Sequence, residues 1–203
     1  MTNAIEPIRI VLLGCGTVGE GVVRLLRANA AMLASKLGAA LELAGVADRS
    51  LKPNPSIGLD AKLITRDAAA LVAREDIDLV VELFGGIEPA YGLIQRALHA
   101  GKDVVTANKA LLAEHGEELF KLAQKNGRAI GFEASVGGGV PIMRTLREAL
   151  AGDRHRAVYG IVNGTCNSIL SMMTDAGAEF KFHFALAADG DRLNPQLFLA
   201  ELG

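Results

Sequence analysis

Short apolar segments alternate with segments of helical periodicity along most of the chain. The segments that predict buried strands cover residues 8–13, 41–47, 77–83, 103–106 and 128–134. Most are rich in Val, Ile and Leu, which is typical of parallel strands that helices cover on both faces. Apolar residues spaced three and four apart predict helices over residues 18–37, 67–74, 89–99 and 108–125. This order implies parallel βαβ units, and hence an α/β fold with a doubly wound parallel sheet.

Residues with special backbone or capping preferences mark the ends of these helices. Gly38, Gly101 and Gly127 follow predicted helices, where a left-handed residue commonly closes the last turn. Asp67 is expected to cap the helix that follows it, and Pro89 suits the first turn of another.

The alternation stops at a run of three glycines, residues 137–139, and Pro141 then begins another predicted helix. That helix is followed by a strand, a turn and a further helix, over residues 157–162, 163–165 and 166–175. We therefore predict one domain over residues 1–135. Residues 136–179 would begin a second, incomplete α+β domain, and residues 180–203 would form an atypical tail.

Composition narrows the functional classes. Half of the 203 residues are hydrophobic and 22% are charged, which excludes a disordered protein. With 21 Lys and Arg against 23 Asp and Glu, and no basic cluster, neither nucleic acid nor a membrane is an expected partner. No signal-peptide pattern or membrane-spanning apolar segment is found, so a cytoplasmic location is expected. Cys15 and Cys166 form neither a disulfide framework nor a metal-type pair, and we expect small buried residues.

A glycine-rich segment, Gly14-Cys15-Gly16-Thr17-Val18-Gly19, follows the first predicted strand and begins the first predicted helix. In this pattern the first glycine permits a tight turn, and the second lets a pyrophosphate approach the backbone. The third lets the helix pack close to the sheet. Free N–H groups at the helix N-terminus add positive potential. The pattern predicts dinucleotide binding, with a plain turn between strand and helix as the alternative.

The second predicted strand ends at Asp48 and Arg49. Residues at this position contact the adenosine ribose in dinucleotide-binding folds. Asp48 would accept a hydrogen bond from a ribose 2′-hydroxyl and favour NAD, whereas Arg49 would bind a 2′-phosphate and favour NADP. Because both are present, the sequence leaves the choice of cofactor open, and a solvated turn is the alternative for both residues.

Thr106-Ala107-Asn108-Lys109 follows the fourth predicted strand, at the edge where open α/β sheets bind ligands. A lysine there can meet a carboxylate or polarise an oxygen. The first turn of a helix disfavours a cation, and this local cost favours a functional role for Lys109 over a solvated helix start.

The fifth predicted strand ends near Glu133, which precedes a glycine-rich turn that extends to Pro141. Backbone carbonyl groups on such a turn can converge on a hard cation, with an oxygen of Glu133 nearby. A flexible hinge between domains is the simpler interpretation, and the residues by themselves favour it.

In their order and spacing, these segments resemble homoserine dehydrogenase. The resemblance rests on five motifs, at residues 14–19, 78–86, 106–110, 133–141 and 160–170. It implies an NAD(P)-binding Rossmann domain followed by a substrate and dimerisation domain, and a homodimer as in the family. It also implies an oxidoreductase that interconverts aspartate semialdehyde and homoserine with NAD(P)H, on the route to threonine, methionine and isoleucine.

The resemblance further implies roles for individual residues. The residues that would hold the pyrophosphate are Gly14, Gly16, Thr17, Val18 and Gly19. Arg49 would lie near the adenosine ribose, and Gly164 would close over the cofactor. Thr106 and Lys109 would line the nicotinamide and substrate side, where Lys109 is the candidate catalytic residue. A monovalent cation, with Na⁺ as the expected ion, would bind mostly to backbone oxygens of Glu133, Val136, Gly138 and Val140.

The resemblance ends at about residue 178. The family continues there with a Gly-Tyr-Ala-Glu-Ala-Asp-Pro segment and later an Asp-x-x-Gly-x-Asp stretch, whose acids bind homoserine and which ends in the proposed proton-donor lysine. This sequence contains neither segment, and Lys181 is its only lysine after Lys125. Residues 180–203 are therefore interpreted as a replaced or altered C-terminus. Since acid catalysis contributes about 10²–10⁴-fold, we expect NAD(P)H binding with feeble reduction of aspartate semialdehyde.

Two other functions stay open from the sequence. One is another two-domain NAD(P)-dependent dehydrogenase that acts on a different small carbonyl compound. The other is a non-catalytic nucleotide-binding module, which would bind the cofactor without turning over any aldehyde.

Overall fold

One parallel sheet organises the part of the protein that the computed structural model describes, residues 5–154, 157, 170–171 and 173–174. Its six strands are β1 (Ile8–Leu13), β2 (Leu41–Ala47), β3 (Ile64–Thr65), β4 (Leu79–Glu82), β5 (Asp103–Thr106) and β6 (Ile130–Gly131). They follow the order β3-β2-β1-β4-β5-β6, and all neighbours are parallel. The predicted doubly wound α/β fold is confirmed.

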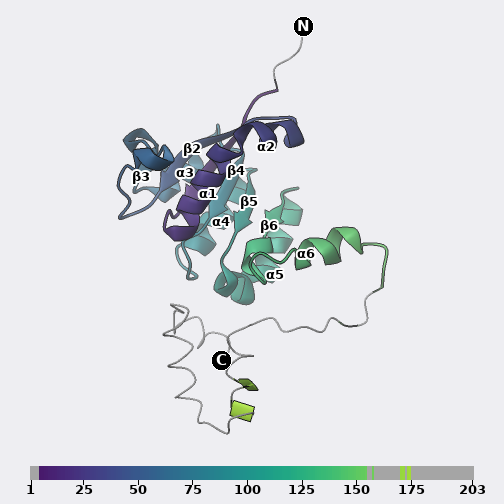
Figure 1. Ribbon diagram of the computed structural model, residues 1–203. Coiled ribbons are helices and arrows are strands. Elements are labelled where there is room, and N and C mark those ends of the chain that lie inside the picture. Colours follow the sequence, from purple (N-terminus) through teal and green to yellow (C-terminus); the bar gives the residue numbers. More distant parts are fainter. Residues whose placement is uncertain (1–4, 155–156, 158–169, 172, 175–203) are drawn as a thin grey trace. The chain divides into compact units, whose positions relative to one another are not determined.

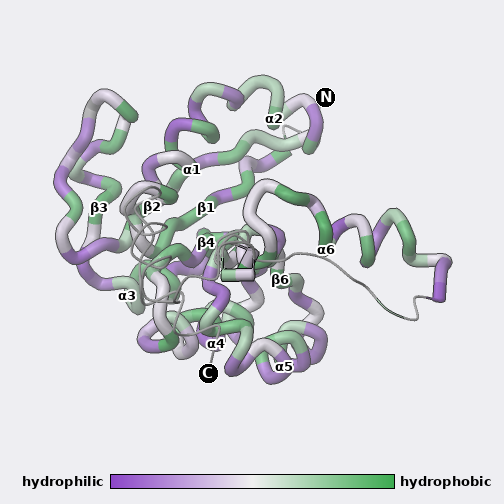
Figure 2. The backbone as a smooth tube through the Cα atoms, turned by 60° about the horizontal axis from the view of Figure 1, so that its bottom comes forward, coloured by the Kyte–Doolittle hydropathy of each residue, from purple (hydrophilic) through white to green (hydrophobic). Residues whose placement is uncertain are grey.

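Helices cover both faces of this sheet (Figure 1). They are α1 (Thr17–Ala28), α2 (Ala30–Leu37), α3 (Ala68–Ala73), α4 (Ala90–His99) and α5 (Lys109–Lys125). The side chains of β1 show how the two faces divide. Val11 and Leu13 belong to the core under α3, α4 and α5, whereas Ile10 and Leu12 pack with Val23 of α1. Figure 2 shows hydrophobic stretches along the central strands, while α5 alternates between hydrophobic and hydrophilic residues.

The N-terminal helical region differs from its prediction, because two helices replace the single helix expected over residues 18–37. Asn29 ends α1 and begins α2, with φ −110° and ψ 15°. Asn leaves helical geometry readily, since its amide group competes for backbone hydrogen bonds. Gly38 ends α2 in the left-handed conformation with φ 75°, as expected.

The predicted helix starts are close to those observed. Asp67 caps α3, with its carboxylate accepting a hydrogen bond from the Ala70 N–H at 2.9 Å. Pro89 and Asn108 are each the residue before their helix rather than its first residue.

Two strands are shorter than predicted and one was not predicted. β4 covers residues 79–82 instead of 77–83, and β6 ends at Gly131 instead of residue 134. Glu133 therefore does not end a strand but begins a 3₁₀ turn, Glu133–Ser135. β6 is an edge strand that pairs through only two residues, so its apolar pattern overstated its length. β3 is too short for an alternating pattern to indicate it.

Contacts divide the protein into two units, Met1–Gly138 and Gly139–Gly203. In the second unit, α6 (Ile142–Arg144) follows Pro141 and continues into a π-helical segment, Thr145–Ala149. The strand and turn predicted next lie, from residue 158 onward, outside the described residues. No helix in the described part of the protein is both long enough and apolar enough to cross a membrane.

Candidate functional site

The glycine-rich turn joins β1 to α1 at the edge where the strands end. Gly14 has φ 96°, and a Cβ atom there would lie 3.0 Å from the backbone carbonyl carbon and oxygen of Leu83. A Cβ atom on Gly19 would lie 2.6 Å from the backbone oxygen of Gly14. Both positions therefore exclude a side chain, the first because of its backbone conformation and the second because α1 packs closely on the turn.

Gly16 differs from these two glycines because its surroundings are open. No heavy atom other than its neighbours in sequence lies within 4 Å of a Cβ built there. Gly16 is the N-cap of α1 and has no side chain with which to cap it, and Thr17 and Val18 after it are exposed. The first helical turn thus begins at an exposed position without a side-chain cap, and the N-terminus of a helix favours an anion.

Asp48, directly after β2, turns its carboxylate back to the glycine-rich turn. Its Oδ2 accepts a hydrogen bond from the Cys15 N–H at 2.9 Å, and its Oδ1 accepts from the N–H groups of Ser50 (2.9 Å) and Leu51 (3.1 Å). The Ser50 hydroxyl also donates to Oδ1, at 3.1 Å. Burial by itself raises the pKa of Asp48, but these hydrogen bonds outweigh it and leave the pKa below its ordinary value. Asp48 therefore has a structural role that the sequence did not predict.

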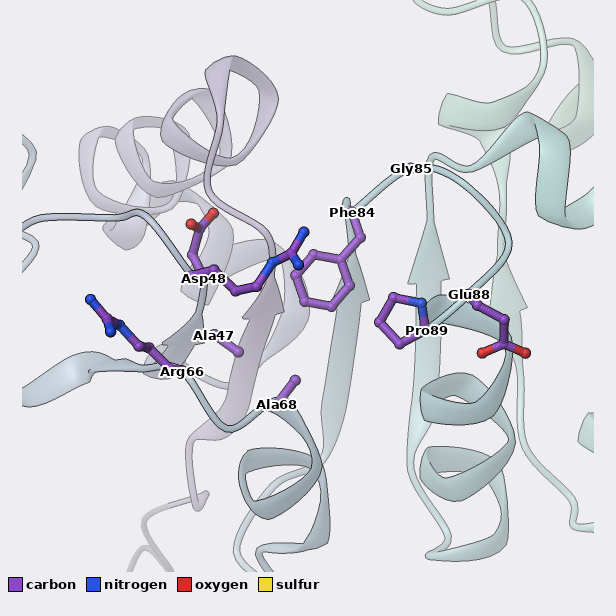
Figure 3. Close-up of a pocket in the computed structure, with 9 residues that line it drawn as sticks. Ala47, Asp48, Arg66, Ala68, Phe84, Gly85, Glu88 and Pro89 are labelled. Carbon is purple, nitrogen blue, oxygen red and sulfur yellow. The ribbon is translucent and has the colours of Figure 1, made fainter.

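A cleft of about 230 Å³ lies beside Asp48, between the ends of β2 and β3 and the loop after β4. The residues that line it are Ala47, Asp48, Arg49, Arg66, Ala68, Phe84, Gly85, Glu88 and Pro89. Figure 3 shows Asp48 and Arg66 on one side, with Phe84 and Pro89 on the β4–α4 loop. An aromatic wall and two guanidinium groups suit a planar ring that carries an anionic group. Sequence reasoning identified Arg49 but missed Arg66, which follows a strand too short to predict.

A second, more open cleft of about 390 Å³ extends from Asp48 over the glycine-rich turn. Cys15 and Gly16 lie on its wall, and Ser50 and Asn54 belong to the loop opposite. Cys15 is itself only 4% exposed, and burial raises the pKa of its thiol, so it is the small buried residue that was expected. The two clefts share Asp48, which lets one extended ligand follow the edge from the turn to the arginines.

Buried polar groups join β4 to β5 at the same edge. Glu82 is fully buried, and its Oε1 accepts a hydrogen bond from the Phe84 N–H at 2.8 Å. Its Oε2 accepts from the Thr106 hydroxyl at 2.6 Å, and the backbone oxygen of Thr106 accepts from the Ser135 hydroxyl at 2.8 Å. Thr106 is also fully buried, so its side chain faces the interior. Sequence reasoning missed Glu82, although an acid at the end of an apolar strand is an unusual core residue.

Asn108 fixes the start of α5 and makes Lys109 the first residue of that helix. Its Oδ1 accepts a hydrogen bond from the Leu111 N–H at 3.1 Å, and its Nδ2 donates to the backbone oxygen of Gly86. Lys109 is exposed. The fold thus brings Lys109 to the same edge as the glycine-rich turn.

The predicted cation-binding residues fall on both sides of the division between the units. Glu133 lies in the 3₁₀ turn, and Val136 follows it in extended backbone with φ −131° and ψ 111°. Gly138 ends the first unit, and Val140, 58% exposed, belongs to the second. Among the described residues, no three His, Cys, Asp or Glu side chains gather as a metal site. Gly164, predicted to close over the cofactor, lies outside the described residues.

Family models match the protein on both sides of the glycine run. The model for the NAD-binding domain of homoserine dehydrogenase matches residues 14–133, which is more than half of the sequence. A second homoserine dehydrogenase model matches residues 141–190. The chain belongs to the homoserine dehydrogenase family. The resemblance drawn from the five sequence motifs is thereby confirmed.

Curated homoserine dehydrogenases align with most of the sequence. The enzyme of Neisseria gonorrhoeae is 45% identical over 175 residues, which are 86% of this chain and 40% of that protein. The enzyme of Corynebacterium glutamicum is 46% identical over 175 residues, again 86% of this chain and 39% of that protein. The chain therefore spans about 40% of the length of the curated homoserine dehydrogenases it matches.

Solved homoserine dehydrogenases share the fold. That of Thiobacillus denitrificans superposes with a TM-score of 0.81 at 43% identity, covering 90% of this chain and 42% of that one. A hyperthermophilic archaeal homoserine dehydrogenase in complex with NADPH gives a TM-score of 0.75 at 26% identity, over 91% of this chain and 61% of that one. The NAD-binding model spans the glycine-rich turn, both clefts and the start of α5.

Proposed function

We propose that this protein binds NADP(H) along the edge where its strands end and takes part in the reduction of aspartate semialdehyde to homoserine. The observation that carries the proposal is the continuity of the open glycine-rich turn with a cleft lined by two arginines. The pyrophosphate would be held at Gly16 and the N-terminus of α1, by N–H groups and the helix dipole. Thr17 and Val18 supply N–H groups of the same helical turn. The adenosine would be held in the cleft beside Phe84.

The preference for NADP over NAD rests on Arg49, Arg66 and Asp48. Two guanidinium groups that line one cleft stabilise a 2′-phosphate by charge-assisted, bidentate hydrogen bonds. Asp48, which would otherwise accept a ribose 2′-hydroxyl, already accepts four hydrogen bonds from the protein. Its carboxylate is committed to the turn, and the two guanidinium groups support a phosphorylated ribose, although Glu88 also lines the cleft.

Lys109 is the residue we propose to act on the substrate. When bound, NADPH supplies a hydride, and hydride addition to an aldehyde places negative charge on the carbonyl oxygen. A cation near that oxygen stabilises the charge, and Lys109 is exposed at the first turn of α5, on the same edge. Thr106, whose side chain is buried, would support this part of the site from within.

The remaining parts of the proposal concern the cation and the biological setting. A monovalent cation, Na⁺ in the first instance, would bind backbone oxygens of Glu133, Val136, Gly138 and Val140. Separately from the cation, we propose that the protein acts as a cytoplasmic, homodimeric enzyme of threonine and methionine biosynthesis. Replacing NaCl by choline chloride at equal ionic strength should weaken NADPH binding if this cation supports the site. Unchanged binding would remove the cation from the proposal.

Calorimetric titration with NADPH and with NADH tests the cofactor assignment. We expect NADPH to bind at least about tenfold more tightly, the effect of one or two charge-assisted hydrogen bonds. Arg49→Ala and Arg66→Ala should each remove most of that preference. Arg128→Ala is the matched control, because Arg128 is exposed and precedes β6, at the opposite edge of the sheet. Equal affinities would contradict the NADP assignment, and no binding of either cofactor would contradict the proposed function.

Turnover of the 203-residue protein tests the catalytic part. We expect NADPH to be oxidised by aspartate semialdehyde at a rate that depends on Lys109, whose cation would stabilise the charge that develops on the carbonyl oxygen. Binding without any turnover would limit the function of these 203 residues to nucleotide binding.

A further inference from the structure

Four of the buried polar residues in the described part of the protein form one hydrogen-bonded group at the carboxyl edge. We call it the Glu82 cluster; its members are Glu82, Thr106, Asn108 and Ser135. None of them is more than 5% exposed. Their side chains come from the ends of β4 and β5, the cap of α5 and the turn after β6. The cluster therefore links the loops that follow three neighbouring strands.

Glu82 stands at the centre of this cluster as the last residue of β4. One carboxyl oxygen accepts the Phe84 N–H at 2.8 Å, and the other accepts the Thr106 hydroxyl at 2.6 Å. Removing a carboxylate from water is costly, and an aliphatic side chain would fill the same place without that cost. The carboxylate adds orientation, because its two oxygens fix the positions of two donors, one on the loop after β4 and one at the end of β5.

Glu82 orients the hydroxyl of Thr106, and Thr106 in turn contacts the residue before α5. Because the Thr106 hydroxyl donates its proton to Glu82, its oxygen is left to accept the Asn108 N–H, at 3.0 Å. Asn108 in turn caps α5 and donates to the backbone oxygen of Gly86. A series of hydrogen bonds thus leads from a buried carboxylate to the residue immediately before Lys109.

We propose that Glu82 is a positioning residue, which acts through Thr106 and Asn108 to hold the start of α5 in the geometry that receives the nicotinamide half of the cofactor. The proposal rests on the proposed function for its ligand. The hydrogen bonds of the Glu82 cluster join groups of the protein itself, so the two ideas can fail separately. The adenosine half meets the protein at the arginine-lined cleft and depends on Glu82 only through the Phe84 N–H.

The decisive variant is Glu82→Gln, which keeps the size of the residue and an acceptor for the Phe84 N–H. Its amide group would present N–H donors to Thr106, whose hydroxyl proton then loses its acceptor. Thr106→Val removes the same hydrogen bond from the other side, and Thr106→Ser retains the hydroxyl. Glu117→Gln is the matched control, because that side chain is 82% exposed on α5.

Two ligands test the two halves of the site separately: NADPH contacts both the nicotinamide half and the adenosine half, whereas 2′,5′-ADP contacts only the adenosine half. For Glu82→Gln we expect NADPH to bind about tenfold more weakly, the effect of one charge-assisted hydrogen bond, and 2′,5′-ADP to bind within about twofold of wild type. Thr106→Val should behave in the same way, whereas Thr106→Ser and Glu117→Gln should resemble wild type. Adding Glu82→Gln to Thr106→Val should weaken NADPH binding little further, because Glu82 acts through the hydroxyl that is already absent.

Amide hydrogen exchange provides a readout that needs no cofactor. In Glu82→Gln the Asn108 N–H should exchange faster than in wild type, while the Phe84 N–H should keep its protection. Unchanged exchange at Asn108 would overturn the proposal. So would a parallel loss of NADPH and 2′,5′-ADP binding, or full additivity in the double variant, since both describe a residue that only stabilises the fold. If wild type binds neither ligand, the proposed function fails, and exchange at Asn108 alone decides whether Glu82 positions α5. If Glu82→Gln does not fold, the comparison of Thr106→Ser with Thr106→Val decides the question.

Discussion

The carboxylate of Asp48 accepts a hydrogen bond from the backbone N–H of Cys15 at 2.9 Å, across 33 positions in the sequence. This contact ties the end of β2 to the second residue of the glycine-rich turn. The same carboxylate also holds the N–H groups of Ser50 and Leu51. One side chain therefore sets the conformation of both walls of the open cleft, which places Asp48 among the determinants of stability as well as of binding.

Asp48→Asn should destabilise the protein at neutral pH by about 2 kcal/mol, because the amide presents a donor to one of the N–H groups that the carboxylate accepts. The pKa of Asp48 is lower in the folded state than the ordinary value of about 3.9. Its contribution to stability is therefore fully present above about pH 4 and is lost as the pH falls through the folded pKa. Urea unfolding should show a constant difference between wild type and variant from about pH 7 to about pH 5, and a shrinking difference below about pH 4. A difference that grows on acidification would contradict this role.

Gly19→Ala and Gly21→Ala should have opposite effects, although both residues lie in α1. A Cβ atom at Gly19 would lie 2.6 Å from the backbone oxygen of Gly14, so the helix must move away from the turn. We expect a loss of about 1–3 kcal/mol in the free energy of unfolding and weaker NADPH binding. Nothing lies within 4 Å of a Cβ at Gly21, where alanine should add about 0.5–1 kcal/mol through helix propensity. Thermal unfolding followed by circular dichroism measures both changes, and similar melting temperatures for the two variants would refute the packing argument.

Lys102→Met should affect stability and leave cofactor binding unchanged. Lys102 is 2% exposed, and its ammonium group donates to the backbone oxygens of Arg74 and of Ile77, the latter at 3.1 Å. Burial lowers the pKa of Lys102, and the two carbonyl groups would lose this donor in the variant. We expect a loss of about 1–3 kcal/mol in urea unfolding. Because Lys102 precedes β5, at the edge opposite the clefts, a changed affinity for NADPH would show that the two edges are coupled.

Lys109→Met should separate binding from chemistry. If Lys109 stabilises charge on the substrate oxygen, any NADPH oxidation by aspartate semialdehyde should fall about 10²-fold, while NADPH affinity stays within about threefold of wild type. Lys125→Met, at the far end of α5, is the control. Spectrophotometric assay and calorimetry on the same preparations make the comparison. Equal turnover in the two variants would exclude Lys109 from the reaction.

The sequence predicted the strands of the sheet except β3, and most helix ends, because those features depend on local patterns. Apolar periodicity located β1, β2 and β5 to the residue. It missed β3 and made β6 too long, because each of these edge strands pairs through only two residues. It also failed at Asn29, where a polar residue inside a helical pattern divides one predicted helix into two.

The candidate site divides in the same way. Gly14, Gly16 and Gly19 were identified from their spacing, since a turn between a strand and a helix is a local structure. Arg66 and Glu82 were not identified, because the residues near them in the sequence do not determine what their side chains contact. Asp48 was predicted to contact a ribose, and that stays a prediction; its hydrogen bond to the glycine-rich turn was not predicted.

The sequence by itself determined the alternation of strands and helices, the glycine-rich turn and the family. Tertiary structure decided the partners, such as Asp48 with Cys15, and Glu82 with Thr106 across 24 positions. The physical reason is that parallel crossovers bring the ends of distant strands to one edge of the sheet. Polar groups that are shielded from water there must form hydrogen bonds with one another. Which groups meet depends on the strand order β3-β2-β1-β4-β5-β6, which no local pattern of residues contains.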